Sequence, residues 1–332
     1  MMKNMNIKYV FSLWALSLLA CGCTNQQDEL EVPPTDGRIG VSACLATPVV
    51  STRTAAEAVP YQGSTPSASN PLDASVWFST ESGTYVAGET LDALPRHTEV
   101  RFNSSGTVYP TGDVLMYPES DVVYCVGLYP YSATEWTNTD ASGDNSNTHA
   151  SHTIDGSQDL MFAPQISGSK ASPISSALAF THQLTWLKIN VIAEDNRAIS
   201  SWGNVTDITV TSPGNKLTVD LSAGTASCNS TPTYIKALEN ASTPLRITTQ
   251  QLGSVFCAPA TSYQVNVKTA NETTGKDLTV TLKNISGENL SGASDAKGKM
   301  FVITLNFKAI STIEATCTLT AWDDDYRTIE GS

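Results

Sequence analysis

The sequence is poor in charge, and above all in positive charge, which limits the partners that it can bind. Only 15% of its 332 residues are charged, and 19 Lys and Arg face 32 Asp and Glu, so the formal net charge is -13. Nucleic acids and anionic lipid surfaces are recognised by clusters of basic side chains. We therefore exclude nucleic acid as a partner and interpret the acidity as an aid to solubility.

The sequence also lacks the common signatures of enzymes and metal sites. It has four histidines and no G-x-S-x-G elbow, Walker A loop or dinucleotide-binding fingerprint. His149 and His152 have an i, i+3 spacing, but they lie in an Asn-, Ser- and Thr-rich stretch without a third ligand nearby. His182 is interpreted as a structural histidine, and the acidic run 323–325 lacks the spacing of an EF-hand loop. We predict a non-enzymatic protein with no catalytic residues, cofactor or metal.

Cysteine is scarce, and its spacing does not indicate a disulfide framework. Of seven cysteines, five lie beyond the N-terminal region and none of these five forms a C-x-x-C pair. The pattern predicts free thiols that behave as small hydrophobic residues, with their redox state left open, at Cys44, Cys125, Cys228, Cys257 and Cys317.

Long hydrophobic runs are absent beyond the first twenty residues. Lys3 and Lys8 precede an apolar run at residues 9–20 that is too short to span a bilayer, as in a signal peptide. The run ends in Leu-Leu-Ala-Cys, which looks like a lipobox and predicts a diacylglyceryl group and palmitate on Cys21. Cys23 is the alternative register, and an ordinary secretory signal with a chance cysteine is the other reading. The lipidated reading predicts an outer-membrane lipid anchor, with the protein at the cell surface.

Short runs of alternating apolar and polar residues dominate the rest of the chain and predict strands. Alternate residues are apolar in residues 39–45, and residues 313–321 alternate strictly. Each run is bounded by turn-forming residues, which favours an all-β fold of the β-sandwich type. The other predicted strands are residues 76–79, 99–102, 122–129, 187–191, 208–210, 217–221, 245–249, 255–258, 265–268, 278–282 and 300–305.

Composition divides the chain into parts. A polar stretch with two adjacent prolines follows the lipobox and is typical of a flexible tether. Residues 133–157, rich in Asn, Ser, Thr and Gly, are predicted as an irregular excursion, and residues 167–173 as a domain boundary. The predicted parts are a signal peptide, a lipidated tether, an N-terminal β-sandwich and a C-terminal β-sandwich, at residues 1–20, 21–37, 38–172 and 173–332.

Five short segments occur in a fixed order along the chain. They are VGLYPY at 126–131, DLMFA at 159–163, FTHQLTWLKI at 180–189, GKMF at 298–301 and AWD at 321–323. Together with the lipobox, they resemble the fimbrillin family, the subunits of type V pili. The resemblance implies two tandem transthyretin-like or Ig-like β-sandwiches in a stalk, tip or accessory subunit of a fimbria.

The resemblance also implies a mechanism of assembly. Subunits of this family are delivered as lipoproteins, and a protease then removes the first strand after an Arg or Lys. An exposed sheet edge is a template for strand addition by another chain. The removable strand would be residues 39–45, with processing at Arg53; Arg38 is the alternative, and an ordinary loop arginine is the other reading of Arg53. The donor would come from residues 313–321 and the short acidic tail 322–332, so other fimbrial subunits are the implied partners.

A second function remains open at this stage, that of a monomeric surface lipoprotein that binds glycans. Aromatic side chains on the surface of a β-sandwich can stack on sugar rings. Four tryptophans are candidates for such platforms, namely Trp77, Trp136, Trp202 and Trp322.

Overall fold

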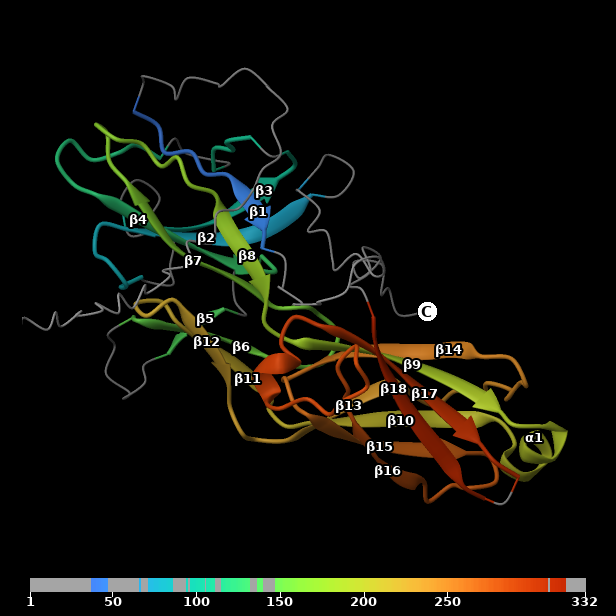
Figure 1. Cartoon of the computed structure of the whole chain (residues 1–332). Helices are drawn as coiled ribbons and strands as arrows, with labels where there is room; N and C mark the ends of the chain where they lie inside the picture. The colour runs from blue at the N-terminus through green and yellow to red at the C-terminus, as the bar shows by residue number, and fades with distance from the viewer. Residues whose placement is uncertain are drawn as a thin grey trace, which may run out of the picture. The chain divides into compact units, whose positions relative to one another are not determined.

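The computed structural model describes residues 37–46, 66, 71–85, 94, 96–104, 106–110, 115–131, 136–139, 147–309 and 311–320. Within these ranges the chain forms eighteen strands, one short α-helix and one 3-10 turn (Figure 1). The predicted all-β class is therefore confirmed. None of the helical segments in the described residues has the length and apolarity needed to cross a membrane.

The first sheet has six strands in the order β1-β8-β7-β4-β2-β3. All neighbours are antiparallel except β1 and β8, which run parallel. Strand β2 is almost entirely buried, as expected for a strand covered on both faces. The bounds are β1 Ala43–Leu45, β2 Leu72–Ser79, β3 Arg96–Phe102, β4 Val123–Tyr129, β7 Met161–Gly168 and β8 Leu178–His182.

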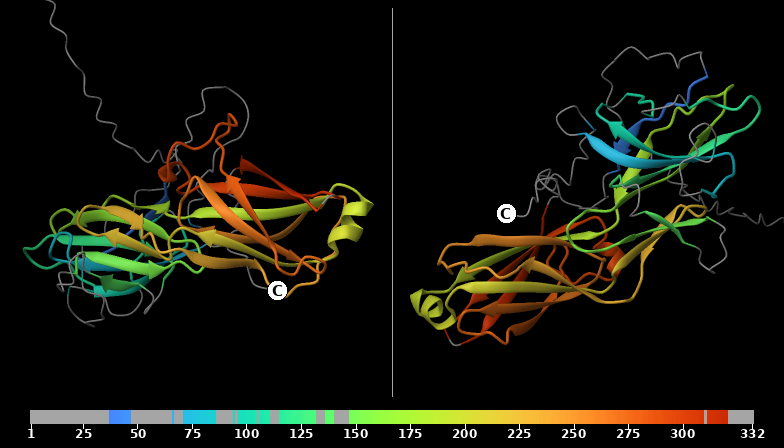
Figure 2. Two further views of the ribbon diagram at one scale, coloured as in Figure 1. Left: turned by 90° about the horizontal axis from the view of Figure 1, so that it is seen from below. Right: turned by 180° about the vertical axis from the view of Figure 1, so that it is seen from behind.

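Two four-stranded sheets, ordered β14-β9-β17-β18 and β13-β10-β15-β16, form a β-sandwich (Figures 1 and 2). Their strands alternate buried and more exposed residues, as the period of two requires. Ser212, at the end of β10, joins the two sheets because its Oγ accepts a 3.0 Å hydrogen bond from the N–H of Ala258, just after β14. The bounds are β9 Thr185–Ala193, β10 Val205–Ser212, β13 Thr233–Leu238, β14 Gln250–Cys257, β15 Ser262–Thr269, β16 Lys276–Thr281, β17 Met300–Phe307 and β18 Ile313–Thr320.

Two strands of a fourth sheet, β5 (Thr137–Thr139) and β6 (His149–Thr153), lie within residues 133–157, so the prediction that this region is an irregular excursion is wrong for these two segments. The order of this sheet is β12-β11-β6-β5, with β11 at Lys216–Asp220 and β12 at Thr225–Cys228. Strand β6 is polar in sequence, yet its three central residues are buried by pairing with β11, which is distant in the chain. The pairing partner, not local hydrophobicity, makes this segment a strand.

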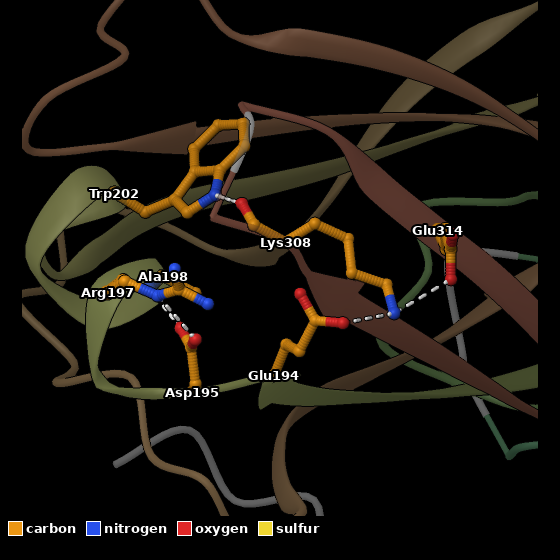
Figure 3. A network of polar contacts seen from close by, with 7 residues as sticks. All are labelled: Glu194, Asp195, Arg197, Ala198, Trp202, Lys308 and Glu314. Atoms are coloured by element: carbon orange, nitrogen blue, oxygen red, sulfur yellow. Dashed lines mark hydrogen bonds and ion pairs between the residues drawn. The ribbon is translucent and has the colours of Figure 1, made fainter.

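Helix α1 (Asn196–Trp202) was not predicted, and it lies within a small network of polar contacts (Figure 3). Asp195 caps its first turn, because its Oδ1 accepts a 2.9 Å hydrogen bond from the N–H of Ala198. At its end, Nε1 of Trp202 donates a 2.8 Å hydrogen bond to the carbonyl oxygen of Lys308. The ammonium of Lys308, just after β17, lies 3.1 Å from Glu194, just after β9, and 3.2 Å from Glu314 in β18.

One predicted strand is absent, and one strand runs into the stretch that was predicted as a domain boundary. Residues 245–249 were predicted as a strand, but they form no strand: Leu245 is buried, whereas Ile247 is 58% exposed. Strand β7 continues through Gly168 and therefore enters residues 167–173, which were predicted as a domain boundary. Strands from both sides of that stretch pair with each other, β8 with β7 and β11 with β6. The division into domains at residue 172 stays a prediction.

Candidate functional site: the first strand and its acceptor

The segment of residues 37–46, which we call the first segment, is packed into the core by every second side chain. Ile39, Val41, Ala43 and Leu45 are each at most 7% exposed. Burying a Val, Leu or Ile side chain, as at three of these positions, stabilises a fold by about 1.5–3 kcal/mol. The predicted strand at residues 39–45 therefore has the predicted alternation, although only Ala43–Leu45 have continuous strand pairing.

Backbone hydrogen bonds hold the first segment on both of its edges. On one edge Leu178 N–H donates to Ser42 O at 2.8 Å, and Ala46 N–H donates to Phe180 O at 2.8 Å. Removal of the first segment would leave these groups of β8 unpaired, and unpaired edge groups are the template for an added strand. The bonds on the other edge are Ile39 N–H to Leu115 O, Val41 N–H to Val108 O, Val108 N–H to Val41 O and Tyr117 N–H to Gly37 O, at 2.7–2.9 Å.

Gly40 allows the first segment to lie close to its neighbours. A Cβ built at this position would lie 2.4 Å from Cγ2 of Thr107 and 2.8 Å from Cε1 of Tyr109. Real Cβ contacts are not that short, so a larger residue would push the segment away. Next to it, the guanidinium of Arg38 lies over the ring of Tyr109, 4.7 Å from its centre.

Strand β8 pairs with the first segment along one of its edges. Phe180 anchors this strand in the core. This side chain is fully buried, and its ring packs against that of Phe102 at 6.2 Å between centres. It fills the space left by Gly127 in β4, where an added Cβ would lie 2.4 Å from Cζ of Phe180. The strand that pairs with β1 is thus fixed from inside the core.

The end of β8 carries a buried pair of titratable side chains. Nδ1 of His182 is hydrogen-bonded to Oδ2 of Asp159, and both side chains are 1% exposed. Asp159 lies two residues before β7, so the pair joins the start of β7 to the end of β8. His182 is placed as a structural histidine should be, and its partner was not identified from the sequence. The sequence signal for this pair was the carboxylate in the DLMFA segment, followed by the histidine in the FTHQL segment.

The remaining predicted site residues divide into described and undescribed positions. Arg38 is half-buried, and its backbone forms an isolated antiparallel β-bridge with that of Met116. Cys21, Cys23 and Arg53 lie outside the described residues, so lipidation and processing stay predictions.

The predicted donor region is partly described. Strand β18 pairs antiparallel with β17 over eight residue pairs, from Ile313 to Thr320. Its apolar residues alternate with exposed Glu and Thr, as predicted. Residues 321–332 lie outside the described part of the chain.

The tryptophans proposed as sugar platforms do not fit that role where the structure describes them. Trp77, Trp136 and Trp202 are at most 3% exposed, and Trp322 is outside the described residues. Stacking on a sugar needs an exposed ring, so these three side chains do not support the glycan-binding alternative.

The two histidines considered as a metal pair lie on β6, with different surroundings. His152 is buried against Trp136, with ring centres 5.0 Å apart, and its Nδ1 lies 2.7 Å from the carbonyl oxygen of Thr153. His149 lies 3.7 Å from Asp220. Among the described residues, no cluster of three or more His, Cys, Asp or Glu side chains is arranged to hold a metal ion.

Comparison with known proteins identifies the family. The model of a family described as fimbrillin-like matches residues 68–322. The chain belongs to the fimbrillin-like family. The family resemblance noted in the sequence is therefore confirmed. The matched range begins after the first segment and includes β2 through β18.

Solved structures named as cell adhesion or fimbrial proteins are similar to this fimbrillin-like chain. A candidate cell adhesion protein from Bacteroides uniformis shares 16% identity, with 88% of this chain and 100% of that chain covered and a TM-score of 0.49. A fimbrial protein from Bacteroides vulgatus shares 14% identity, with 86% and 99% covered and a TM-score of 0.36. A search of curated proteins returned no match.

Proposed function

We propose that this chain is a structural subunit of a cell-surface fimbria that supports adhesion, and that it assembles by strand addition after processing. Membership of the fimbrillin-like family supports a structural role at the cell surface rather than a catalytic one. The single observation that carries the assembly mechanism is the first segment, whose apolar face is buried in the core. Removing it would open an apolar site beside unpaired backbone groups.

The chain reaches the outer membrane as a lipoprotein in this proposal. Lipid is attached to Cys21, with Cys23 as the alternative register. Cys21→Ser should abolish incorporation of labelled palmitate in the native host, whereas Cys23→Ser should retain it. The reverse result would assign the lipid to Cys23, and incorporation in both variants would contradict this part of the proposal.

Processing occurs at Arg53, because this arginine follows the first segment in the sequence. A cut there separates the whole segment from β2. Arg38 lies inside the first segment, so a cut after it would leave Ile39 to Leu45 attached and their buried side chains in place.

The incoming strand is supplied by the C-terminal region of a neighbouring subunit, that is residues 313–321 with the tail 322–332. Strand β18 is paired with β17 in its own sheet, so the tail is the part that can be offered without dismantling that sheet. A chain truncated after Thr320 should therefore accept a neighbour but fail to donate to one. Its role as stalk, tip or accessory subunit follows from whether the full-length chain forms long fibres.

The experiment that tests the proposal is native digestion with an arginine-specific protease, followed by size-exclusion chromatography and electron microscopy. We expect oligomers from the wild type and from Arg38→Ala, and monomers from Arg53→Ala. Arg38→Ala is the matched control, because it removes an arginine from the same region without removing the proposed cut. A wild-type chain that is cut at Arg53, loses its first segment and remains monomeric at high concentration would contradict strand addition.

A further inference from the structure

Strand β8 has very uneven support along its five residues. Its first three residues, Leu178, Ala179 and Phe180, pair with β1. Only its last two residues, Thr181 and His182, pair with β7. When the first segment leaves, the described backbone pairing of β8 is therefore confined to its last two residues, although β8 is the strand that must receive the next chain.

Side chains reinforce this short junction between β7 and β8. Besides the buried contact between His182 and Asp159, Oγ1 of Thr181 donates a 3.1 Å hydrogen bond to Phe162 O. The N–H of Gln183 donates a 2.8 Å hydrogen bond to Leu160 O. These contacts gather at the one end of β8 that stays paired when β1 is absent.

The His182–Asp159 contact is chemically different from the rest of this junction. Polar groups that lie 1% exposed are costly to bury unless they are hydrogen-bonded, and a buried pair adds less to stability than apolar packing would. Its geometric constraint is strong, because loss of one partner leaves the other buried without it. The pair therefore fixes the orientation of β8 relative to β7 at the end where the two strands are paired.

We propose that the Asp159–His182 pair is the positioning element that holds β8 ready to accept a strand once the first segment is gone. This inference rests on the proposed function, because it assumes that the first segment is released. In the uncut chain β1 and the pair both hold β8, so loss of the pair has little effect on β8. In the cut chain β8 has lost β1, so the pair and the neighbouring hydrogen bonds of Thr181 and Gln183 carry more of its positioning, and loss of the pair weakens the acceptor.

A peptide with the sequence of residues 37–46, carrying Cys44→Ser and a fluorescent label, is a direct probe of the acceptor. It is added to full-length protein that has been cut at Arg53 and separated from its own first segment, and binding is measured by anisotropy. We expect wild type to bind, and Asp159→Ala to bind at least tenfold more weakly. Asp159→Asn keeps an oxygen for His182 and should restore binding to within threefold of wild type.

Ser212→Ala is the matched control. It also removes a fully buried side-chain hydrogen bond, at the end of β10 and away from β8. Its peptide affinity should stay within threefold of wild type. If Ser212→Ala and Asp159→Ala lose the same amount of affinity, the loss reflects general destabilisation and the inference is wrong. The inference is also wrong if cut Asp159→Ala binds the peptide with wild-type affinity.

Amide hydrogen exchange separates this inference from the proposed function. The N–H of Gln183 reports on the junction without any added strand. We expect its exchange in Asp159→Ala to be at least tenfold faster than in wild type after the cut and within threefold before it. If the peptide fails to bind cut wild type but this exchange pattern holds, strand addition is wrong and the positioning role stands. If exchange is the same in both cut proteins, the positioning role is wrong.

Discussion

The two strands at the ends of the described chain, β1 and β18, differ in how far their side chains are buried. Strand β1 has three parallel residue pairs, but the apolar side chains of its segment are almost completely buried. Strand β18 has eight antiparallel pairs, but of its apolar residues only Ile313 is buried and the others are half-buried. The first strand is thus held by buried side chains together with backbone hydrogen bonds on both edges, and the last mainly by its backbone ladder. Departure of the first strand would leave an apolar site beside unpaired backbone groups, whereas departure of the last would leave mainly unpaired backbone.

The largest expected effect comes from removing the anchor of β8. Phe180→Ala should lower the free energy of unfolding by about 4 kcal/mol, as large core truncations do, measured by urea denaturation. Phe301→Ala in β17, also fully buried, is the control and should cost about the same. Only Phe180→Ala should speed native proteolysis of residues 37–46. If residues 37–46 are equally protected in both variants, Phe180 has no special role in holding that segment.

The side-chain difference between the two strands can be measured directly. Ile39→Ala should cost about 3 kcal/mol, because its side chain is 1% exposed, whereas Leu319→Ala on half-buried β18 should cost about 1 kcal/mol. Both values come from denaturant midpoints at constant slope. The opposite order would mean that β1 is not held by its side chains.

The thiol of Cys317 reports on the stability of β18. Burial raises its pKa from the usual 9.0 to about 11, against a smaller lowering by a hydrogen bond with the backbone of Lys283. At pH 7.5 its thiolate population, and so its labelling rate with a disulfide reagent, should be about a hundredfold below that of an unfolded thiol. Release of the first segment should leave that rate unchanged, as followed by mass spectrometry. A rise in the rate would show that the two strands are coupled.

The same thiol predicts a pH dependence with a definite sign. Between pH 9 and 11 the unfolded chain loses the Cys317 proton while the folded chain keeps it. The unfolded state then binds fewer protons, so the free energy of unfolding decreases as pH rises through this window. Cys317→Ser should flatten this part of the stability curve, and an unchanged slope would contradict the assignment.

The smallest expected effect concerns the polar network at the start of β18. Hydrogen bonds to Glu194 and Glu314 raise the pKa of Lys308. Its contribution is therefore present at neutral pH and is lost as pH rises through its folded pKa. Lys308→Met should lower the melting temperature slightly at pH 7, and this effect should vanish once the pH exceeds the raised folded pKa of Lys308. Exposed ion pairs contribute little, so a large loss at pH 7 would show that this network matters more to β18 than its ladder.

The sequence predicted the elements with local alternation and missed those that depend on distant partners. The segment from Ile39 to Leu45 and strand β18 were both predicted, because period-two burial is visible in the residues themselves. Strand β6, in contrast, has the sequence HASHT and becomes a strand through its pairing with β11. No local pattern encodes that partner. Residues 245–249 show the opposite error: their apolar residues predicted a strand, but the segment joins no strand ladder and forms no strand.

The candidate site was also only half visible. The segment that we propose to be removed could be identified from its alternation and from the family resemblance. The acceptor did not, because Phe180 fits into the notch over Gly127, and Asp159 meets His182, only when β4, β7 and β8 lie together. Contacts of this kind depend on three strands at once and leave no periodic signal in any of them.

The parallel pairing of β9 with β17 has a consequence for the order of folding. Residues 185–193 find their neighbour only at residues 300–307, more than a hundred positions later. Contacts of such long range form slowly, since a large loop must close first. A chain in which residues 300–320 are not yet available cannot complete this sheet. The β-sandwich that contains β9 therefore completes its folding only after the hairpin of β17 and β18 has been made.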